Sequence, residues 1–221
     1  MTSIKRIVIT SLGNPGQYRD TYHSIGHIAL EALQKSLTHD QPPFTPEKIG
    51  SQYTLASVGP RITLWQSPSV MNYSGKWLNR AFTSYVKDND LQLTDTALIV
   101  VHDELEAELG AIKTRAWGQS PRGHNGVKSL HESMRCRNYP WARLAVGTGR
   151  PSSRANHAVS EFVLSKVTNR CRSVIEETAP HGIFQAVTAL VEGWEQEPAP
   201  KLEERGGPGG YLCIDWITTL R

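Results

Sequence analysis

The 221-residue sequence has no long apolar run and only three cysteines, and each of these features excludes some classes of protein. No apolar run approaches the roughly 20 residues that a membrane-spanning helix needs. A strand-like segment already begins at Arg6, so we expect no targeting peptide. Cys136, Cys171 and Cys213 form no CxxC pair, which argues against disulfides and a cysteine zinc site. We therefore expect a protein without a membrane segment, in the cytoplasm or, in a eukaryote, in the mitochondrion.

Several catalytic motifs are also missing. Neither GxGxxG nor GxxxxGK[ST] is present, so dinucleotide binding has little support. Without GxSxG or a reactive-cysteine context, a covalent acyl-enzyme has no obvious nucleophile. His23 and His27 have the four-residue spacing of a metal-binding pair, but the glutamate of HExxH is absent. We expect a site with no metal and no cofactor.

Acidic residues are scarce in the middle of the chain. Between Leu109 and Ser160 nine basic residues face one acid, Glu132, so this segment carries a charge of +8 within a chain of +3. Such a segment attracts RNA or another polyanion, although a merely solvated basic surface is the alternative. The candidates for phosphate contact are Lys113, Arg115, Arg122, Lys128, Arg143 and Arg150.

Strand and helix patterns alternate along the chain, which predicts an α/β fold with a twisted mixed sheet flanked by helices, as a single domain over 1–194. Strands are predicted at 6–11, 53–58, 62–65, 97–101, 111–117 and 143–147. Helices are predicted near 25–37, 77–86 and 169–194, the last with a kink or break at Pro180. Three prolines predict a loop at 41–46, and residues 195–221 are predicted to be a Pro- and Gly-rich tether with an apolar tail.

Polar side chains stand where predicted strands give way to loops, the usual place of active sites in open α/β sheets. Asn14 follows the first strand, Asp103 follows the fourth, and His23 lies at the start of the first helix. If those two strands are neighbours, the three residues converge. A histidine held by an aspartate is a natural general base. Taken singly, the histidine and the aspartate are each more often a helix cap or a packed surface residue.

Two further asparagines precede predicted or possible helices. Asn72 lies in MNYSG, and Asn125 follows Gly123 and His124 in the glycine-bounded basic loop GQSPRGHNGVKSL. Amide side chains can orient a substrate carbonyl or stabilise an oxyanion. Helix capping is the alternative for either asparagine.

Five motifs together resemble those of bacterial-type peptidyl-tRNA hydrolase: SLGNPGQYRDTYHSIG, MNYSG, VVHDELEAELG, GQSPRGHNGVKSL and RLAVGTGRP. The resemblance covers about residues 4–194 and includes VSEFVLSKV. It implies a monomeric α/β fold of the phosphorylase/hydrolase-like type. It also implies an enzyme that cleaves the ester between a peptide and the 3′ ribose of tRNA, without metal or cofactor.

The resemblance also implies roles for individual residues. It makes His23 the general base, Asp103 the carboxylate that orients it, and Asn125 the residue that places the attacking water. Arg115 matches a basic residue that clamps the terminal phosphate of tRNA. The residues implied to hold the peptide or the acceptor end, or to form the gating loop, are Asn14, Tyr18, Asn72, Gly123 and His124.

The chain departs from the family pattern at four positions. Tyr22 and Ser24 flank His23 where the family reads TRHN, Val70 replaces an aromatic residue, and Ala145 replaces a basic one. These departures motivate an alternative, a non-catalytic RNA-binding protein on the same scaffold, like relatives that assist organellar RNA splicing. A hydrolase of another small ester is a third hypothesis, which would leave the basic segment unused.

Overall fold

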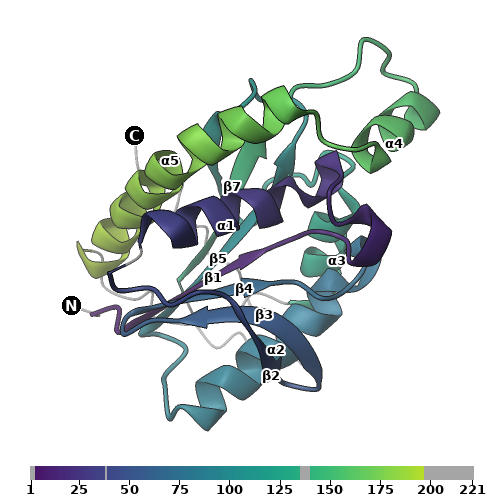
Figure 1. Ribbon diagram of the computed structural model, residues 1–221. Coiled ribbons are helices and arrows are strands. Elements are labelled where there is room, and N and C mark those ends of the chain that lie inside the picture. Colours follow the sequence, from purple (N-terminus) through teal and green to yellow (C-terminus); the bar gives the residue numbers. More distant parts are fainter. Residues whose placement is uncertain (1–2, 38, 135–139, 197–221) are drawn as a thin grey trace.

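The computed structural model describes residues 3–37, 39–134 and 140–196, which form a mixed seven-stranded sheet with helices on both faces (Figure 1). The strand order is β2-β3-β4-β1-β5-β7-β6. The strands are β1 (Arg6–Ser11), β2 (Thr45–Ile49), β3 (Gln52–Val58), β4 (Ile62–Gln66), β5 (Thr96–Glu104), β6 (Ile112–Arg115) and β7 (Trp141–Gly147). The helices are α1 (Ile25–Ser36), α2 (Ser74–Asp88), α3 (Asn125–Ser133), α4 (Asn156–Leu164) and α5 (Asn169–Gln196), with 3-10 turns η1 (Gly16–Tyr18), η2 (Tyr22–Ser24) and η3 (Met71–Tyr73). The predicted fold class is confirmed.

The centre of the sheet is parallel and its outer strands are antiparallel. β1 pairs in parallel with both β4 and β5, and β5 pairs in parallel with β7. These central strands are almost wholly buried, as expected for parallel strands covered on both faces. Because β1 and β5 are neighbours, their carboxyl ends meet at one edge of the molecule, which is the condition for convergence of the polar residues.

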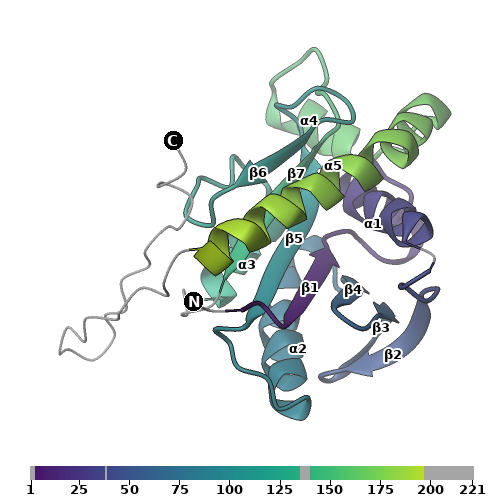
Figure 2. The ribbon, with the colours of Figure 1, turned by 90° about the vertical axis from the view of Figure 1, so that its left-hand side faces the viewer.

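Each face of the sheet has its own apolar core. On one face α1 and α5 cover side chains such as Ile9 and Ile99, and on the other α2 and α3 cover Val8 and Leu98. Figure 2 shows the two helical layers with the sheet between them. The alternation of side chains along each strand supplies apolar groups to both layers.

Three departures from the predicted elements have a clear physical reason. A strand ending at Val101 is predicted, whereas β5 continues to Glu104 because its polar last residues still pair with β7. A loop is predicted at 41–46, but Thr45 begins β2, an exposed edge strand of the kind that tolerates a proline at position 46. Of the kink or break predicted at Pro180, the break does not occur: α5 continues through Pro180, and residues such as Ala179 and Ile183 pack into the core on either side.

The sequence analysis identifies neither α3 nor α4. α3 begins inside the glycine-bounded loop segment, and α4 has no fully buried residue, although Phe162 packs against the core. Most of the predicted tether and tail at 195–221 lies outside the described residues, as do Cys136 and Cys213. Cys171 is a free, buried thiol. None of the described helices is both long and apolar enough to cross a bilayer.

The approach of α2 to α3 depends on Gly75. Its backbone N donates to Ser129 Oγ at 3.0 Å, and a Cβ at this position would lie 2.0 Å from the carbonyl oxygen of Ser129. We expect Gly75→Ala to cost about 1–3 kcal/mol of unfolding free energy because the two helices must separate. Chemical denaturation measures this. Gly193→Ala in α5, where a Cβ meets open space, is the control that retains stability. Equal stability of the two variants would contradict the close approach.

Candidate active site

A cavity of about 220 Å³ opens at the carboxyl ends of β1 and β5. It is lined by Asn14, His23, Val70, Met71, Asn72, Asn125, Ser160, Val163 and Leu164. The first turn after β1, the turn before α2 and the start of α3 each contribute an asparagine. Residues more than 100 positions apart in the sequence therefore face one space.

His23 and Asp103 are in direct contact at the edge of this cavity. Nδ1 of His23 lies 3.0 Å from both carboxylate oxygens of Asp103. His23 belongs to η2, one turn before α1, while Asp103 is the penultimate residue of β5. A ring that donates its Nδ1 proton to the carboxylate leaves Nε2 as the basic atom. The predicted convergence of these two residues is confirmed.

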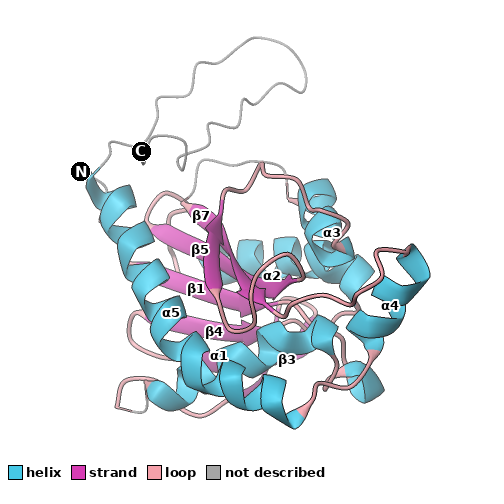
Figure 3. Ribbon diagram, turned by 90° about the horizontal axis from the view of Figure 1, so that it is seen from above, coloured by secondary structure: helices cyan, strands magenta, loops and turns pink. Residues whose placement is uncertain are grey.

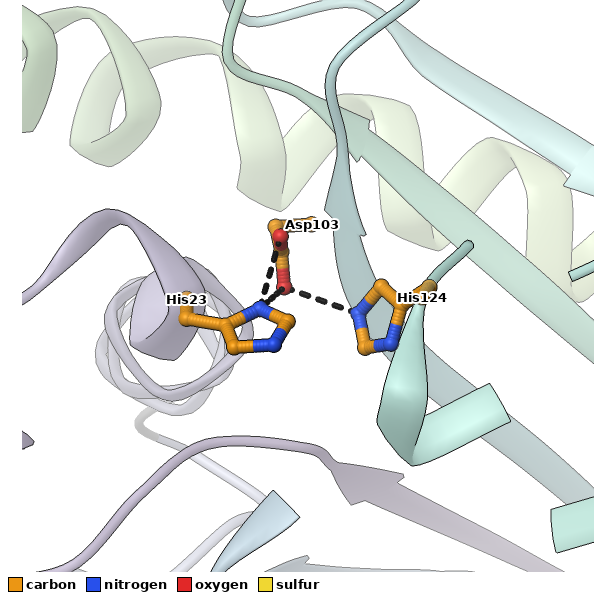
Figure 4. Close-up of side chains that lie close together, drawn as sticks. All are labelled: His23, Asp103 and His124. Atoms are coloured by element: carbon orange, nitrogen blue, oxygen red, sulfur yellow. Dashed lines mark hydrogen bonds and ion pairs between the residues drawn. The ribbon is translucent and has the colours of Figure 1, made fainter. Parts of the chain in front are cut away.

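The same carboxylate holds a second imidazole. Nε2 of His124 lies 2.9 Å from Oδ1 of Asp103, and Nδ1 of His124 accepts a hydrogen bond from the backbone N of Val127. Figure 4 shows His23 and His124 on opposite sides of Asp103. The backbone contact caps the N-terminus of α3, so it also fixes which ring nitrogen of His124 donates to Asp103. Sequence reasoning paired Asp103 with His23 alone.

Burial and charge act in opposite directions on this cluster. Burial lowers the pKa of His23, but the charge and hydrogen bond of Asp103 outweigh it and leave the pKa above its usual value. Burial would raise the pKa of Asp103, yet the two imidazoles hold it well below its usual value. The carboxylate is therefore ionised and can stabilise a proton on His23.

Asn14 is held on two sides. Its backbone N donates to Ser24 Oγ at 2.9 Å, and its side-chain Oδ1 accepts from the backbone N of Met71 at 2.9 Å. Ser24 Oγ in turn donates to the carbonyl of Tyr18. With Oδ1 occupied, the amide Nδ2 is the group that Asn14 can offer to a ligand. Ser24, a departure from the family pattern, thus fixes the loop that carries Asn14.

The other predicted site residues divide into two groups. Asn72 and Asn125 are exposed and line the cavity, in line with the prediction that they meet a substrate. Tyr18 is 41% exposed in η1, and neither it nor Gly123 lines the cavity. Gly123 has a φ of 89°, which favours glycine, and the preceding residue, Arg122, is also in the left-handed region.

The loop before His124 is anchored by a buried arginine. The guanidinium of Arg143, on β7, donates to the carbonyls of Ala116 and Gln119 at 3.0 and 2.9 Å. Arg143 is only 2% exposed, so its position argues against the predicted contact with phosphate. Instead it helps to place the loop whose last residue bonds to Asp103.

The remaining predicted phosphate contacts lie on β6, in the loop before α3, on α3 and just after β7. Lys113, Arg122 and Lys128 are exposed. Arg115 pairs with Glu104 at 3.2 Å, and Arg150 pairs with Glu106. A bound phosphate would have to compete with these carboxylates for two of the five side chains.

A metal ion has one candidate location among the described residues. One atom each from His23, Asp103 and His124 lies within 4.8 Å of the others, and imidazole and carboxylate are ligand types of zinc. His27, whose four-residue spacing from His23 the sequence analysis considered and set aside as a metal-binding pair, does not belong to this cluster. Nδ1 of His27 bonds to Ser11 Oγ at 2.7 Å, and burial lowers its pKa to about 3. A site without metal stays a prediction.

Comparison with known proteins shows which family the chain resembles. Residues 8–205 match the model of the family described as peptidyl-tRNA hydrolase. A probable peptidyl-tRNA hydrolase of Schizosaccharomyces pombe is 34% identical over 84% of both chains, and a peptidyl-tRNA hydrolase of Saccharomyces cerevisiae is 34% identical over 84% of this chain and 97% of its own.

The fold has a counterpart among solved structures. The crystal structure of a peptidyl-tRNA hydrolase from Acinetobacter baumannii covers 88% of this chain and 92% of its own, with a TM-score of 0.65 and 24% identity. At that identity the likeness concerns the fold alone. The family match, the two yeast relatives and the motifs now located around one cavity agree: this chain belongs to the peptidyl-tRNA hydrolase family.

Proposed function

We propose that this protein hydrolyses the ester that joins a peptide to the 3′ ribose of tRNA, with a water molecule activated by His23. The contact of His23 Nδ1 with Asp103, which leaves Nε2 as the basic atom of a residue that lines the cavity, is the observation that carries the proposal. The family membership and the relatives' names support the reaction type. In this proposal the base, the carboxylate and the amide donors are all side chains of this chain.

The proposed reaction moves one proton from water to His23 and then to the leaving group. Nε2 of His23 accepts a proton from water as the water oxygen attacks the ester carbonyl. Asp103 stabilises the imidazolium that results, because its carboxylate stays ionised beside the ring. The proton then passes to the departing 3′ oxygen of the ribose as the C–O bond breaks. The products are a free peptide and an intact tRNA.

Amides around the cavity can stabilise the negative charge on the carbonyl oxygen. We assign this role, together with placement of the water, to Asn125, and peptide or ribose contacts to Asn14 and Asn72. An ester is already reactive toward water, so a base, amide donors and accurate placement are sufficient. The absence of a GxSxG motif from the sequence is thus consistent with the reaction.

The tRNA would bind along the basic surface next to the cavity. Lys113, Arg122 and Lys128 are exposed there, and Arg115 lies on β6 with Lys113. We propose that they follow the phosphates of the acceptor stem and that the 3′ CCA end enters the cavity, with the protein acting as a monomer. Arg150 joins this surface only if a phosphate displaces Glu106.

A non-catalytic RNA-binding protein on the same scaffold is the second candidate, motivated by the departures at Tyr22, Ser24 and Val70. The structure favours catalysis, because Ser24 still anchors the Asn14 loop and the His23–Asp103 contact is formed. Release of labelled peptide from diacetyl-lysyl-tRNA by the purified protein distinguishes the two. RNA binding without release would support the non-catalytic candidate.

Removal of the base should slow turnover without preventing binding. We expect His23→Ala to lower kcat by about 10²- to 10⁴-fold, the usual contribution of a general base. Single-turnover hydrolysis of peptidyl-tRNA measures this. His181→Ala, an exposed histidine on α5, is the matched control and should keep full activity. Full activity of His23→Ala would remove His23 from the mechanism.

The pH dependence should report the state of His23. The base works only when neutral, so activity rises with pH through the pKa of His23, which Asp103 holds above its usual value. In Asp103→Asn burial remains without the compensating charge, so the acid limb should move to lower pH and the maximal rate should fall. Asp95→Asn, at the opposite end of β5, is the control whose pH profile should not change. An unshifted acid limb in Asp103→Asn would count against the pairing.

The basic surface predicts a salt dependence. If Arg115 contacts a phosphate, Arg115→Ala should weaken tRNA binding and reduce the slope of log K against log salt by about 0.9. Fluorescence titrations of the protein with tRNA, repeated at salt concentrations from about 50 to about 300 mM, measure this slope. Arg80→Ala, exposed on α2 outside the basic segment, should leave it unchanged. An identical slope in Arg115→Ala and wild type would exclude the contact.

A further inference from the structure

α4 is a short helix with little to hold it in place. None of its nine residues is buried, and its N-cap residue, Ala155, provides no side-chain hydrogen bond. Figures 1 and 3 show it at the edge of the molecule, joined by a loop at each end. Isolated helices of this length are marginal in water, so α4 depends on contacts with its neighbours.

An aromatic stack joins α4 to the body of the protein. The rings of Tyr22 and Phe162 lie 4.3 Å apart between centroids, at an angle of 26°. Tyr22 is 9% exposed and belongs to the core between the sheet and α1, whereas Phe162 is a partly buried residue of α4 that packs against that core. The stack therefore connects α4 to the turn that also carries His23.

Backbone contacts secure the segment after α4 but not α4 itself. The N of Tyr22 donates to the carbonyl of Ser165 at 3.2 Å, and the N of Val167 donates to the carbonyl of Asp20 at 2.9 Å. Both contacts lie beyond the last residue of the helix. Within α4 itself, the ring of Phe162 supplies the aromatic contact that links the helix to η2.

α4 forms one wall of the cavity. Ser160, Val163 and Leu164 line it on the α4 side, and Val70 and Met71 line it as well. Four of these five side chains are apolar. The cavity next to His23 is therefore completed only when α4 is docked, and its apolar lining suits an apolar side chain.

We infer that Tyr22 is a positioning residue that docks α4 through its stack on Phe162, and so builds the subsite for an apolar side chain of the peptide. The inference rests on the proposed hydrolysis of peptidyl-tRNA. Tyr22 stands where the family pattern has an arginine. The aromatic stack on Phe162 therefore depends on a residue in which this chain departs from the family pattern. When α4 is displaced, the apparent affinity for the peptide falls by the fraction of molecules that are docked.

The kinetic test separates binding from chemistry. An offset aromatic stack is worth a factor of about 2 to 10 in an equilibrium, so Tyr22→Ala should raise KM by about that factor, with kcat within about twofold. The substrates are a peptidyl-tRNA whose peptide ends in leucine and one that ends in glycine, and the increase should be larger for leucine. Tyr22→Phe keeps the stack and should restore the KM of the wild type.

Phe162→Ala removes the same stack from the exposed side, which keeps the test valid if loss of Tyr22 perturbs the core. It should match Tyr22→Ala, and the double variant should be no worse than either single variant. Tyr53→Ala, a tyrosine 71% exposed on β3, is the control for the loss of a phenol group. Additive effects of the two substitutions, or a Tyr22→Phe variant as impaired as Tyr22→Ala, would overturn the inference.

A second readout does not depend on activity. Amide hydrogen exchange over residues 156–164 should become faster in Tyr22→Ala and in Phe162→Ala, and stay unchanged in Tyr22→Phe and Tyr53→Ala. If the protein binds RNA without hydrolysis, this exchange pattern still holds, so failure of the proposed function and failure of the dock are distinguishable. Unchanged exchange over α4 in both alanine variants would contradict the dock.

Discussion

The carboxylate of Asp103 is the group on which the candidate active site depends. It is buried at the end of a central strand and accepts hydrogen bonds from imidazoles on two different segments, His23 before α1 and His124 before α3. A buried charge without partners is costly, so the folded protein favours the arrangement that brings both rings to it. The same contacts orient His23 as the base and hold the loop that ends at His124. The stability of this edge of the sheet is therefore linked to the geometry of the candidate active site.

The four departures from the family pattern have different structural consequences. Ser24 fixes the Asn14 loop, and Tyr22 stacks on α4, so two of them take part in building the site. Val70 lines the cavity at 48% exposure, and Ala145 is fully buried within β7. Ala145 cannot contact a phosphate, so this position supplies no second basic residue beside Arg115. Arg115 itself pairs with the carboxylate of Glu104.

The sequence predicted the parts of the fold that follow from periodicity. The buried parallel strands, α1 and the convergence of Asn14, His23 and Asp103 are of this kind, because apolar runs mark central strands and parallel strands end at one edge. The bond from His124 to Asp103 was not predictable, since it requires a loop that Arg143 holds through two carbonyls from the neighbouring strand. β2 and α4 were not predicted because neither element contains a buried residue.

The tautomer and pKa of His23 test the central claim most directly, by nuclear magnetic resonance of the imidazole nitrogens across a pH titration. Our account predicts a neutral ring with its proton on Nδ1, bound to Asp103, a bare Nε2, and a pKa above the usual value of 6.5. A neutral ring protonated on Nε2, or a pKa below 6.5, would contradict the claim that Asp103 holds His23 as the base.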